Sequence, residues 1–171
     1  MKPWLPVLTC AACLLAGSAG LASPPPASRG WTHVTMARDH YAQVSDRGDQ
    51  LVVHCLGDAR EIVLYVDQST LDPALKGRPS ALLAIVIDNS DQVLWVPGKL
   101  ITVRDKISIG VGGPAADGLV HSIAAATRKV RTSIVTEMPR PETPHYNPTD
   151  FPVDGAATAI KAAYDGCGIP F

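Results

Sequence analysis

Short apolar runs separated by turn residues recur along most of this chain, a pattern typical of β-strands. Two such runs, 51–55 and 61–67, flank the turn-forming segment 56–60 and predict a β-hairpin. A second hairpin is predicted where the runs 81–88 and 92–96 flank an Asn-Ser-Asp turn. Further strands are predicted at 99–104, 106–111 and 131–138, whereas 31–42 fits either a strand or irregular structure.

Two helices complete the predicted elements. Apolar residues recur at helical spacing over 155–165, and Gly166 and Gly168 follow as the predicted end of that helix. A shorter helix is predicted over 119–127, preceded by a turn and capped by Asp117. Short strands with closely spaced turns and two helices indicate an α+β fold, mainly β, arranged as an antiparallel β-sandwich.

The N-terminus has the pattern of a secretion signal. Lys2 precedes an apolar stretch at 4–15, and small residues then lead to a cleavage position after Ala22. A transmembrane anchor is the alternative, but proline and glycine interrupt the stretch and three prolines follow it directly. The predicted organisation is a signal peptide at 1–22, a proline-rich leader at 23–30 and a single β-rich domain at 31–171.

The cysteines support export. Cys10 and Cys13 lie within the predicted signal, where the apolar run before them is short for a lipoprotein signal, and only Cys55 and Cys167 remain after cleavage. Two thiols in an oxidising compartment favour a disulfide between them, which would contribute about 4 to 5 kcal/mol by closing a loop of about 110 residues. The competing interpretations are a catalytic thiol or half of a metal site. His54 adjoins Cys55, but neighbouring strand residues face opposite sides and cannot bind one ion together. We therefore predict a periplasmic or secreted protein.

Composition narrows the class of partner. The formal net charge is −1 at pH 7 and no basic cluster occurs, which argues against nucleic acid and anionic membrane surfaces. Aromatic residues make up only 5% of the chain, which disfavours an aromatic platform for carbohydrates or bases. No segment beyond the signal is long and apolar enough to predict a membrane span in the mature chain.

No motif for catalysis, a cofactor or a metal is recognised. The five histidines (33, 40, 54, 121 and 145) lack metal-ligand spacing, so no metal or cofactor is predicted. Neither a Gly-x-Ser-x-Gly nor a Ser-x-x-Lys motif occurs, and the glycine-rich segment 110–114 lacks the lysine of a phosphate loop. We predict a protein that is not an enzyme and has no catalytic residue.

Two polar segments are candidate contact surfaces. Arg47-Gly48-Asp49 is the RGD tripeptide of receptor ligands, but all three are ordinary turn residues, and a turn is the favoured interpretation. Five prolines between 139 and 152 predict a long surface loop, and such loops tend to be functional or disordered. Its polar residues form the predicted contact loop: Arg140, Glu142, His145, Tyr146 and Asp150.

The order of elements resembles a group of exported bacterial proteins. The shared features are Trp31, the strand 51–55, Val86-Ile87-Asp88 followed by Trp95, a helix and strand at 119–138, and Phe151, Val153, Gly155 and Ala159 before Cys167. In these the chain resembles the VasI-type accessory proteins of type VI secretion and, more distantly, the invasion-associated locus B proteins. The resemblance implies an envelope accessory role without catalysis, and it transfers no active-site residue.

The expected function is that of an exported, non-enzymatic envelope interaction or accessory protein, linked to secretion or host contact through an envelope or secreted protein partner. The alternative is a periplasmic small-ligand-binding or protease-inhibitor-like β module, whose signature would be an apolar cavity between sheets.

Overall fold

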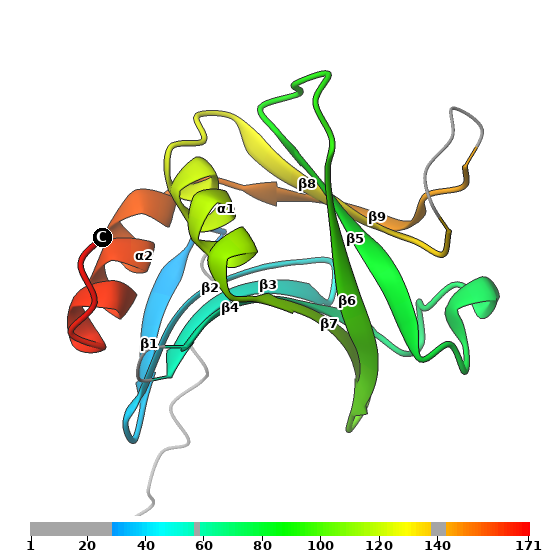
Figure 1. Ribbon diagram of the computed structural model, residues 1–171, viewed down its shortest axis with the longest axis horizontal. Helices are drawn as coiled ribbons and strands as arrows, with labels where there is room; N and C mark the ends of the chain where they lie inside the picture. Colours follow the sequence, from blue (N-terminus) through cyan, green and yellow to red (C-terminus); the bar gives the residue numbers. More distant parts are fainter. Residues whose placement is uncertain (1–28, 57–58, 138–142) are drawn as a thin grey trace, which may run out of the picture.

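The computed structural model describes residues 29–56, 59–137 and 143–171, which have the predicted α+β, mainly β fold (Figure 1). The strands are β1 (Thr32–Met36), β2 (Asp39–Asp46), β3 (Asp49–Leu56), β4 (Ala59–Asp67), β5 (Ser80–Ile87), β6 (Leu94–Val103), β7 (Lys106–Gly112), β8 (Lys129–Val135) and β9 (Tyr146–Pro152). The helices are α1 (Pro114–Ala124) and α2 (Ala156–Gly166), with a short 3-10 helix at Pro73–Leu75. Both predicted hairpins are confirmed, as β3–β4 and β5–β6.

The nine strands form one antiparallel sheet in the order β1-β2-β3-β4-β7-β6-β5-β8-β9. β6 joins the two halves of this sheet, because residues 94–99 pair with β5 and residues 99–103 pair with β7. Gly98 lies at the changeover, where a Cβ atom would stand only 2.6 Å from Ile109 Cγ1. The predicted sandwich of two separate sheets is therefore not confirmed, since a single sheet folds over the core. The predicted strand 99–104 is likewise the second half of β6.

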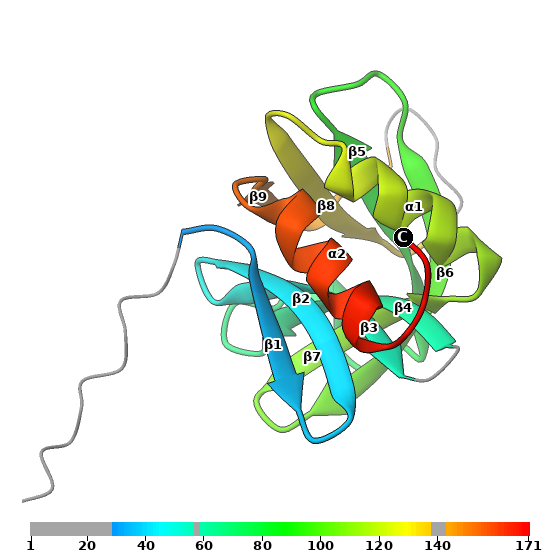
Figure 2. The same ribbon diagram turned by 90° about the vertical axis from the view of Figure 1, so that its left-hand side faces the viewer.

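The sheet bends so strongly that its two halves face each other. Strands β1 to β4 and β7 form an arch, and β5, β8 and β9 lie on its convex side (Figure 1). Helices α1 and α2 contact each other and cover the same convex side (Figure 2). The arch thus presents one face to the core and helices, and its concave face to solvent.

Alternation along the arch strands builds the core. Side chains two residues apart share a face of a strand, so every second residue of β2, β3 and β4 points inward. In the middle of these strands the inward residues are apolar and at most 1% exposed, and residues of α2 pack against them: Ala42, Val44, Leu51, Val53, Ile62, Leu64, Ile160, Ala163 and Tyr164. The residues between them lie on the concave face, away from the core.

The helix α1 begins earlier than predicted, at Pro114 rather than Leu119, and it ends at Ala124. Proline suits the first turn of a helix because its missing N–H would have no intrahelical partner there. Gly113 is the N-cap, and its positive φ of 72° favours glycine. The predicted cap was wrong, because Asp117 lies inside the first turn and its carboxylate forms an ion pair with Arg60 instead (2.7 Å).

The helix α2 agrees with its prediction to within one residue. Its end is a Schellman motif, in which the N–H groups of Gly168 and Ile169 donate to the carbonyl oxygens of Asp165 and Tyr164 (3.1 and 3.0 Å). Gly168 has φ 70°, as expected of the residue after a helix cap, whereas Gly166 is the last helical residue. This ending fixes the position of Cys167.

Candidate binding groove

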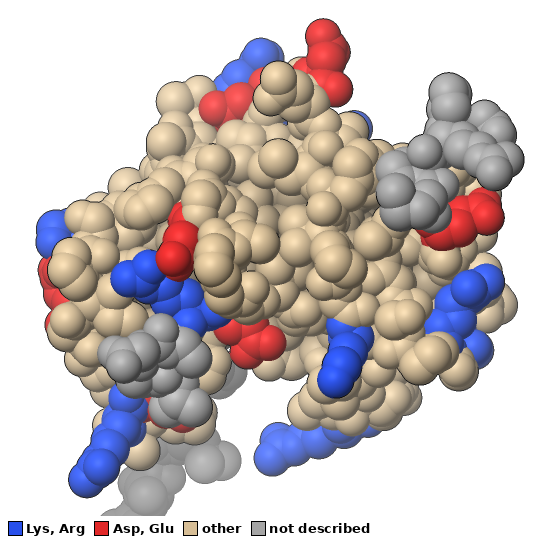
Figure 3. All heavy atoms as spheres, viewed as in Figure 1, with Lys and Arg blue, Asp and Glu red and all other residues tan. Residues whose placement is uncertain are grey.

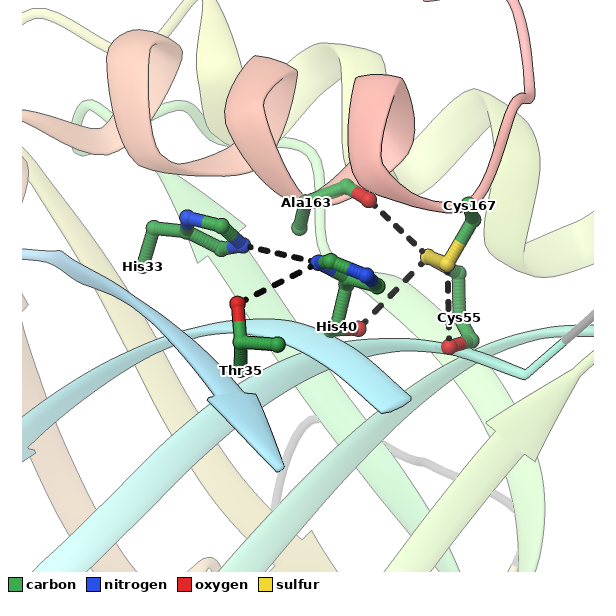
Figure 4. Close-up of a disulfide and its surroundings, with 6 residues drawn as sticks. All are labelled: His33, Thr35, His40, Cys55, Ala163 and Cys167. Carbon is green, nitrogen blue, oxygen red and sulfur yellow. Dashed lines mark hydrogen bonds between the residues drawn. A yellow bond between two sulfur atoms is a disulfide. The ribbon is translucent and has the colours of Figure 1, made fainter. Parts of the chain in front are cut away.

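The predicted disulfide is present and joins Cys55 of β3 to Cys167, the C-cap of α2, across 112 residues. The two Cα atoms are 6.4 Å apart, and Cys55 is 1% exposed. The Cys55 sulfur lies 3.2 Å from the carbonyl oxygen of Ala163 and 3.5 Å from that of His40 (Figure 4). The bridge therefore holds the last turn of α2 against β2 and β3, which is a structural role.

Two of the histidines meet beside this disulfide. The rings of His33 and His40 are stacked with centroids 5.5 Å apart, and His33 Nε2 lies 3.3 Å from His40 Nδ1 (Figure 4). Gly166 lies directly against the His40 ring, since a Cβ atom at residue 166 would collide with that ring. Among the described residues, no group of three or more His, Cys, Asp or Glu side chains could hold a metal ion.

The predicted contact loop is partly wrong, because its second half is the edge strand β9. Arg140 and Glu142 lie outside the described residues. Tyr146 pairs with Ile134 and packs against the core, whereas Asp150 faces the other way and binds Arg131 and Lys129 (2.6 and 2.7 Å). His145 is exposed, with Nδ1 2.7 Å from Ser133 Oγ and its ring beside Trp95. The described residues of this set therefore do not form one contact surface.

The RGD tripeptide is a turn, as predicted. Arg47 and Gly48 have positive φ values (49° and 92°) and form the two-residue connection between β2 and β3. Asp49 is only 6% exposed: its carboxylate accepts hydrogen bonds from Thr149 Oγ1 at 2.6 Å and from the Asp67 N–H at 3.3 Å. A receptor that recognises RGD needs this carboxylate, and here the fold already uses it.

Asp88, which the resemblance singled out, ties the end of β5 to the start of β8. Its carboxylate accepts hydrogen bonds from the backbone N–H groups of Thr127 (2.8 Å), Arg128 (2.7 Å) and Lys129 (3.2 Å). The N–H and hydroxyl of Thr127, together with the other two N–H groups, lower the pKa of Asp88. The residue therefore supports the connection between α1 and β8.

The concave face of the arch carries a groove that the sequence analysis missed. Two adjoining cavities of about 610 and 290 Å³ share Glu61, Val63 and Tyr65 of β4. The larger extends over β7 and β6, the smaller over β3 and β2, and Figure 3 shows the molecule hollowed on this side. We call this surface the concave groove; it is lined by Asp39, Tyr41, Gln43, Gln50, Val52, His54, Glu61, Val63, Tyr65, Pro97, Gly98, Lys99, Ile101, Val103, Ser108 and Gly110.

Strand register arranges these residues in rows. Tyr41 pairs with His54 and His54 with Glu61, so these side chains share one row. Val52 pairs with Val63 in the next row, and both are only 7% exposed, which makes them the floor of the groove. A third row consists of Gln50, Tyr65, Ser108 and Ile101.

Glu61 lies where the two cavities meet. A Cβ atom on Gly110 would collide with the Glu61 carboxyl group, so glycine at this position lets Glu61 lie across β7. Within the described part of the chain, the carboxylate forms no hydrogen bond or ion pair. The charged residues that line the groove are therefore Glu61, Asp39 and Lys99, and the Glu61 carboxylate faces solvent.

Two tyrosines stand near this carboxylate. Partial burial and then the charges of Glu61 and Tyr41 raise the pKa of Tyr65, which keeps its phenol protonated at neutral pH. The ring of Tyr41 meets that of His54 edge to face, with centroids 6.1 Å apart. The groove therefore combines charged side chains, aromatic rings and an apolar floor, which suits binding.

The sequence contains a weak signal for this groove. The residues between the buried ones in β2, β3 and β4 are mostly aromatic, amide or ionisable: Tyr41, Gln43, Gln50, His54, Glu61 and Tyr65. The turns between β2 and β3 and between β3 and β4 determine how these strands pair, and therefore which of these side chains lie side by side. No sequence pattern predicts the bend of the sheet that makes this face concave.

A comparison with protein-family models, with curated proteins and with solved structures found no match. In the described part of the chain, neither helix has the length and apolar character that a membrane crossing would require.

Proposed function

We propose that this chain is an exported envelope protein that acts by binding a partner in the concave groove and has no catalytic activity of its own. The observation that carries this proposal is the groove itself, an open surface with an apolar floor and a carboxylate that has no cationic partner among the described residues. Such combinations of apolar area and a few placed polar groups are typical of binding sites.

Export is supported by two independent features. The first 22 residues have the pattern of a cleavable signal. The Cys55–Cys167 disulfide fits an oxidising compartment, where such bonds form and persist. The association with a secretion machine rests on the resemblance to VasI-type proteins, and secretion genes beside this one would support it.

Binding rather than catalysis is supported by the state of the reactive groups in the groove. The hydroxyl of Ser108 donates to the carbonyl oxygen of Ile101 at 3.2 Å. His54 contacts the Tyr41 ring and forms no hydrogen bond with a hydroxyl or thiol nucleophile in the described residues. A nucleophilic mechanism would need a base within hydrogen-bonding distance of its nucleophile.

Site-specific photo-crosslinking in cells that export the protein tests this proposal. A photoreactive residue at Gln43 or Ile101, on two sides of the groove, should give a discrete adduct with one envelope or secreted protein. The matched control is Thr158, an exposed residue of α2, which should give none. Adducts that are equal at all three positions, or absent from the groove positions, would contradict the proposal.

A small-ligand-binding module is the second candidate. The smaller cavity, of about 290 Å³, is close to the lower size limit of ligand pockets, and this observation favours it. Small molecules extracted from the envelope should then raise the melting temperature of the wild-type protein but not that of Val63→Trp, which fills the groove floor. An equal shift in both proteins would place the ligand elsewhere.

A further inference from the structure

We propose that Glu61, Tyr41 and Tyr65 bind the side chain of an arginine or lysine that a partner polypeptide presents to the concave groove. This inference rests on the proposed binding function and names the chemistry that the groove recognises.

Charge complementarity is the first argument. The smaller cavity is lined by two carboxylates, Asp39 and Glu61, and by no lysine or arginine. The nearest basic residue along β7, Lys106, instead donates to the carbonyl oxygen of Gly48 (2.6 Å). Lys99 of β6 lines the larger cavity on the other side of β7 but forms no ion pair with Glu61. The two carboxylates of the smaller cavity therefore favour a cation from outside.

The aromatic walls fit the same ligand. Tyr41 and Tyr65 both line the smaller cavity, and Glu61 lies close enough to raise the pKa of Tyr65. A cation near the face of a neutral phenol ring gains from the ring quadrupole, and a carboxylate beside it adds charge-assisted hydrogen bonds. Guanidinium and ammonium groups satisfy both conditions.

The amide pair suggests that the ligand is a polypeptide. Gln50 Nε2 donates to Gln43 Oε1 at 2.6 Å, which leaves the Gln50 carbonyl oxygen and the Gln43 NH2 group without a partner in the described residues. Peptide groups of an extended segment offer the complementary donor and acceptor. The groove is also open and spans five strands, whereas small-molecule sites enclose most of the ligand surface.

The far end of the groove adds an apolar contact. Ile101 and Val103 of β6 are 54% and 44% exposed, and they line the larger cavity. The Glu61 carboxyl lies over Gly110 of β7, whose partner on β6 is Lys99, and Ile101 lies two residues further along β6. Residues i and i+2 of an extended peptide are about 7 Å apart on one face. We therefore expect a segment with an apolar residue two positions away from the basic one, and the probe below tests one of the two orders.

The test uses defined peptides and the oxidised mature protein at low ionic strength. The probe is acetyl-Gly-Arg-Gly-Leu-Gly-amide, and its neutral counterpart carries citrulline in place of arginine. We expect the arginine peptide to shift the backbone amide NMR signals of β2, β3, β4, β6 and β7, and the citrulline peptide to bind about fivefold to tenfold more weakly.

Single substitutions test whether the arginine peptide binds at Glu61 and Tyr65. Glu61→Gln should weaken the arginine peptide by about fivefold to tenfold, and Tyr65→Leu should also weaken it. Glu137→Gln, at an exposed glutamate outside the groove lining, should leave binding unchanged. Unchanged melting temperatures would show that the variants are folded.

Three outcomes overturn the inference: equal binding of the arginine and citrulline peptides, no effect of Glu61→Gln, or agmatine binding as tightly as the peptide. The last result would identify a small organic cation as the ligand instead. The inference and the proposed function can fail separately. If the crosslinked adduct at Gln43 persists in Glu61→Gln at wild-type yield, the groove binds a partner but not through a basic side chain.

Discussion

Removing the disulfide tests how much the covalent link between β3 and α2 stabilises the fold. Replacing both Cys55 and Cys167 with alanine opens a loop with a sequence separation of 112. The chain-entropy model assigns such a loop about 4.8 kcal/mol at 25 °C, within a general range of about 2 to 5 kcal/mol for native disulfides. Typical domains have a net stability of only about 5 to 15 kcal/mol, so the loss should be easy to measure.

Urea unfolding followed by circular dichroism provides the assay. The double-alanine variant should lose about 2 to 5 kcal/mol relative to the oxidised wild type, and the reduced wild type should behave similarly because it lacks the same bond. Thiol titration of unfolded protein should find no free thiol in the oxidised wild type and one in Cys55→Ala. Hydrogen exchange should increase first in α2, whose last turn the bridge holds to the sheet.

A stability difference below about 1 kcal/mol would refute the reasoning, because the opened loop would then cost almost nothing. Two free thiols in the wild-type protein, purified without reductant, would refute the disulfide itself. Because Cys55 is buried, its replacement also leaves a small cavity. Agreement between the double-alanine variant and the reduced wild type separates that packing loss from the loss of the bond.

Three further predictions concern single residues. Gly98→Ala should destabilise the protein by about 2 kcal/mol in urea unfolding, since the new Cβ would overlap Ile109. Gly118→Ala in α1 should instead stabilise it by about 0.5 to 1 kcal/mol, because nothing lies within 4 Å of the new Cβ. Asp150, whose pKa is lowered to about 2 mainly by the Arg131 hydrogen bond, should contribute stability above about pH 4 that is lost as the pH falls toward 2. With a side chain 37% exposed, Asp150→Asn should cost about 1 kcal/mol at pH 6 and almost nothing at pH 2, and equal costs at both pH values would contradict this. Asp88→Ala should lower the melting temperature by a few degrees in calorimetry, because three backbone N–H groups lose their acceptor, and an unchanged midpoint would contradict it.

The elements that sequence patterns predicted well are those set by local interactions. Both hairpins join neighbouring segments through short turns, and α2 shows a helical repeat followed by a glycine with positive φ. The disulfide could be predicted because only two of the cysteines lie outside the predicted signal. The hairpins and the helix need only neighbouring residues in sequence, whereas the disulfide follows from the count of cysteines.

The incorrect element predictions concern residues whose structural role depends on strands distant in sequence. Pro97 and Gly98 look like a break between two strands, yet they lie at the point where one long strand changes partners. Pro148 and Pro152 suggest a loop, but β9 is an edge strand, where a missing N–H can be tolerated. Neither distinction can be made without knowing the order of strands in the sheet.

The concave groove also depends on the order of strands in the sheet. Gly110 illustrates why we propose that the groove is a functional feature. Glycine in the interior of a strand costs about 0.5 to 1 kcal/mol relative to alanine. The core does not require this glycine, because residue 110 pairs with Val63 and Lys99 on the concave face, away from the helices. Only the Glu61 carboxyl would collide with a side chain there. Glycine at position 110 therefore leaves the space over β7 that the Glu61 carboxyl occupies, and this space belongs to the groove rather than to the core.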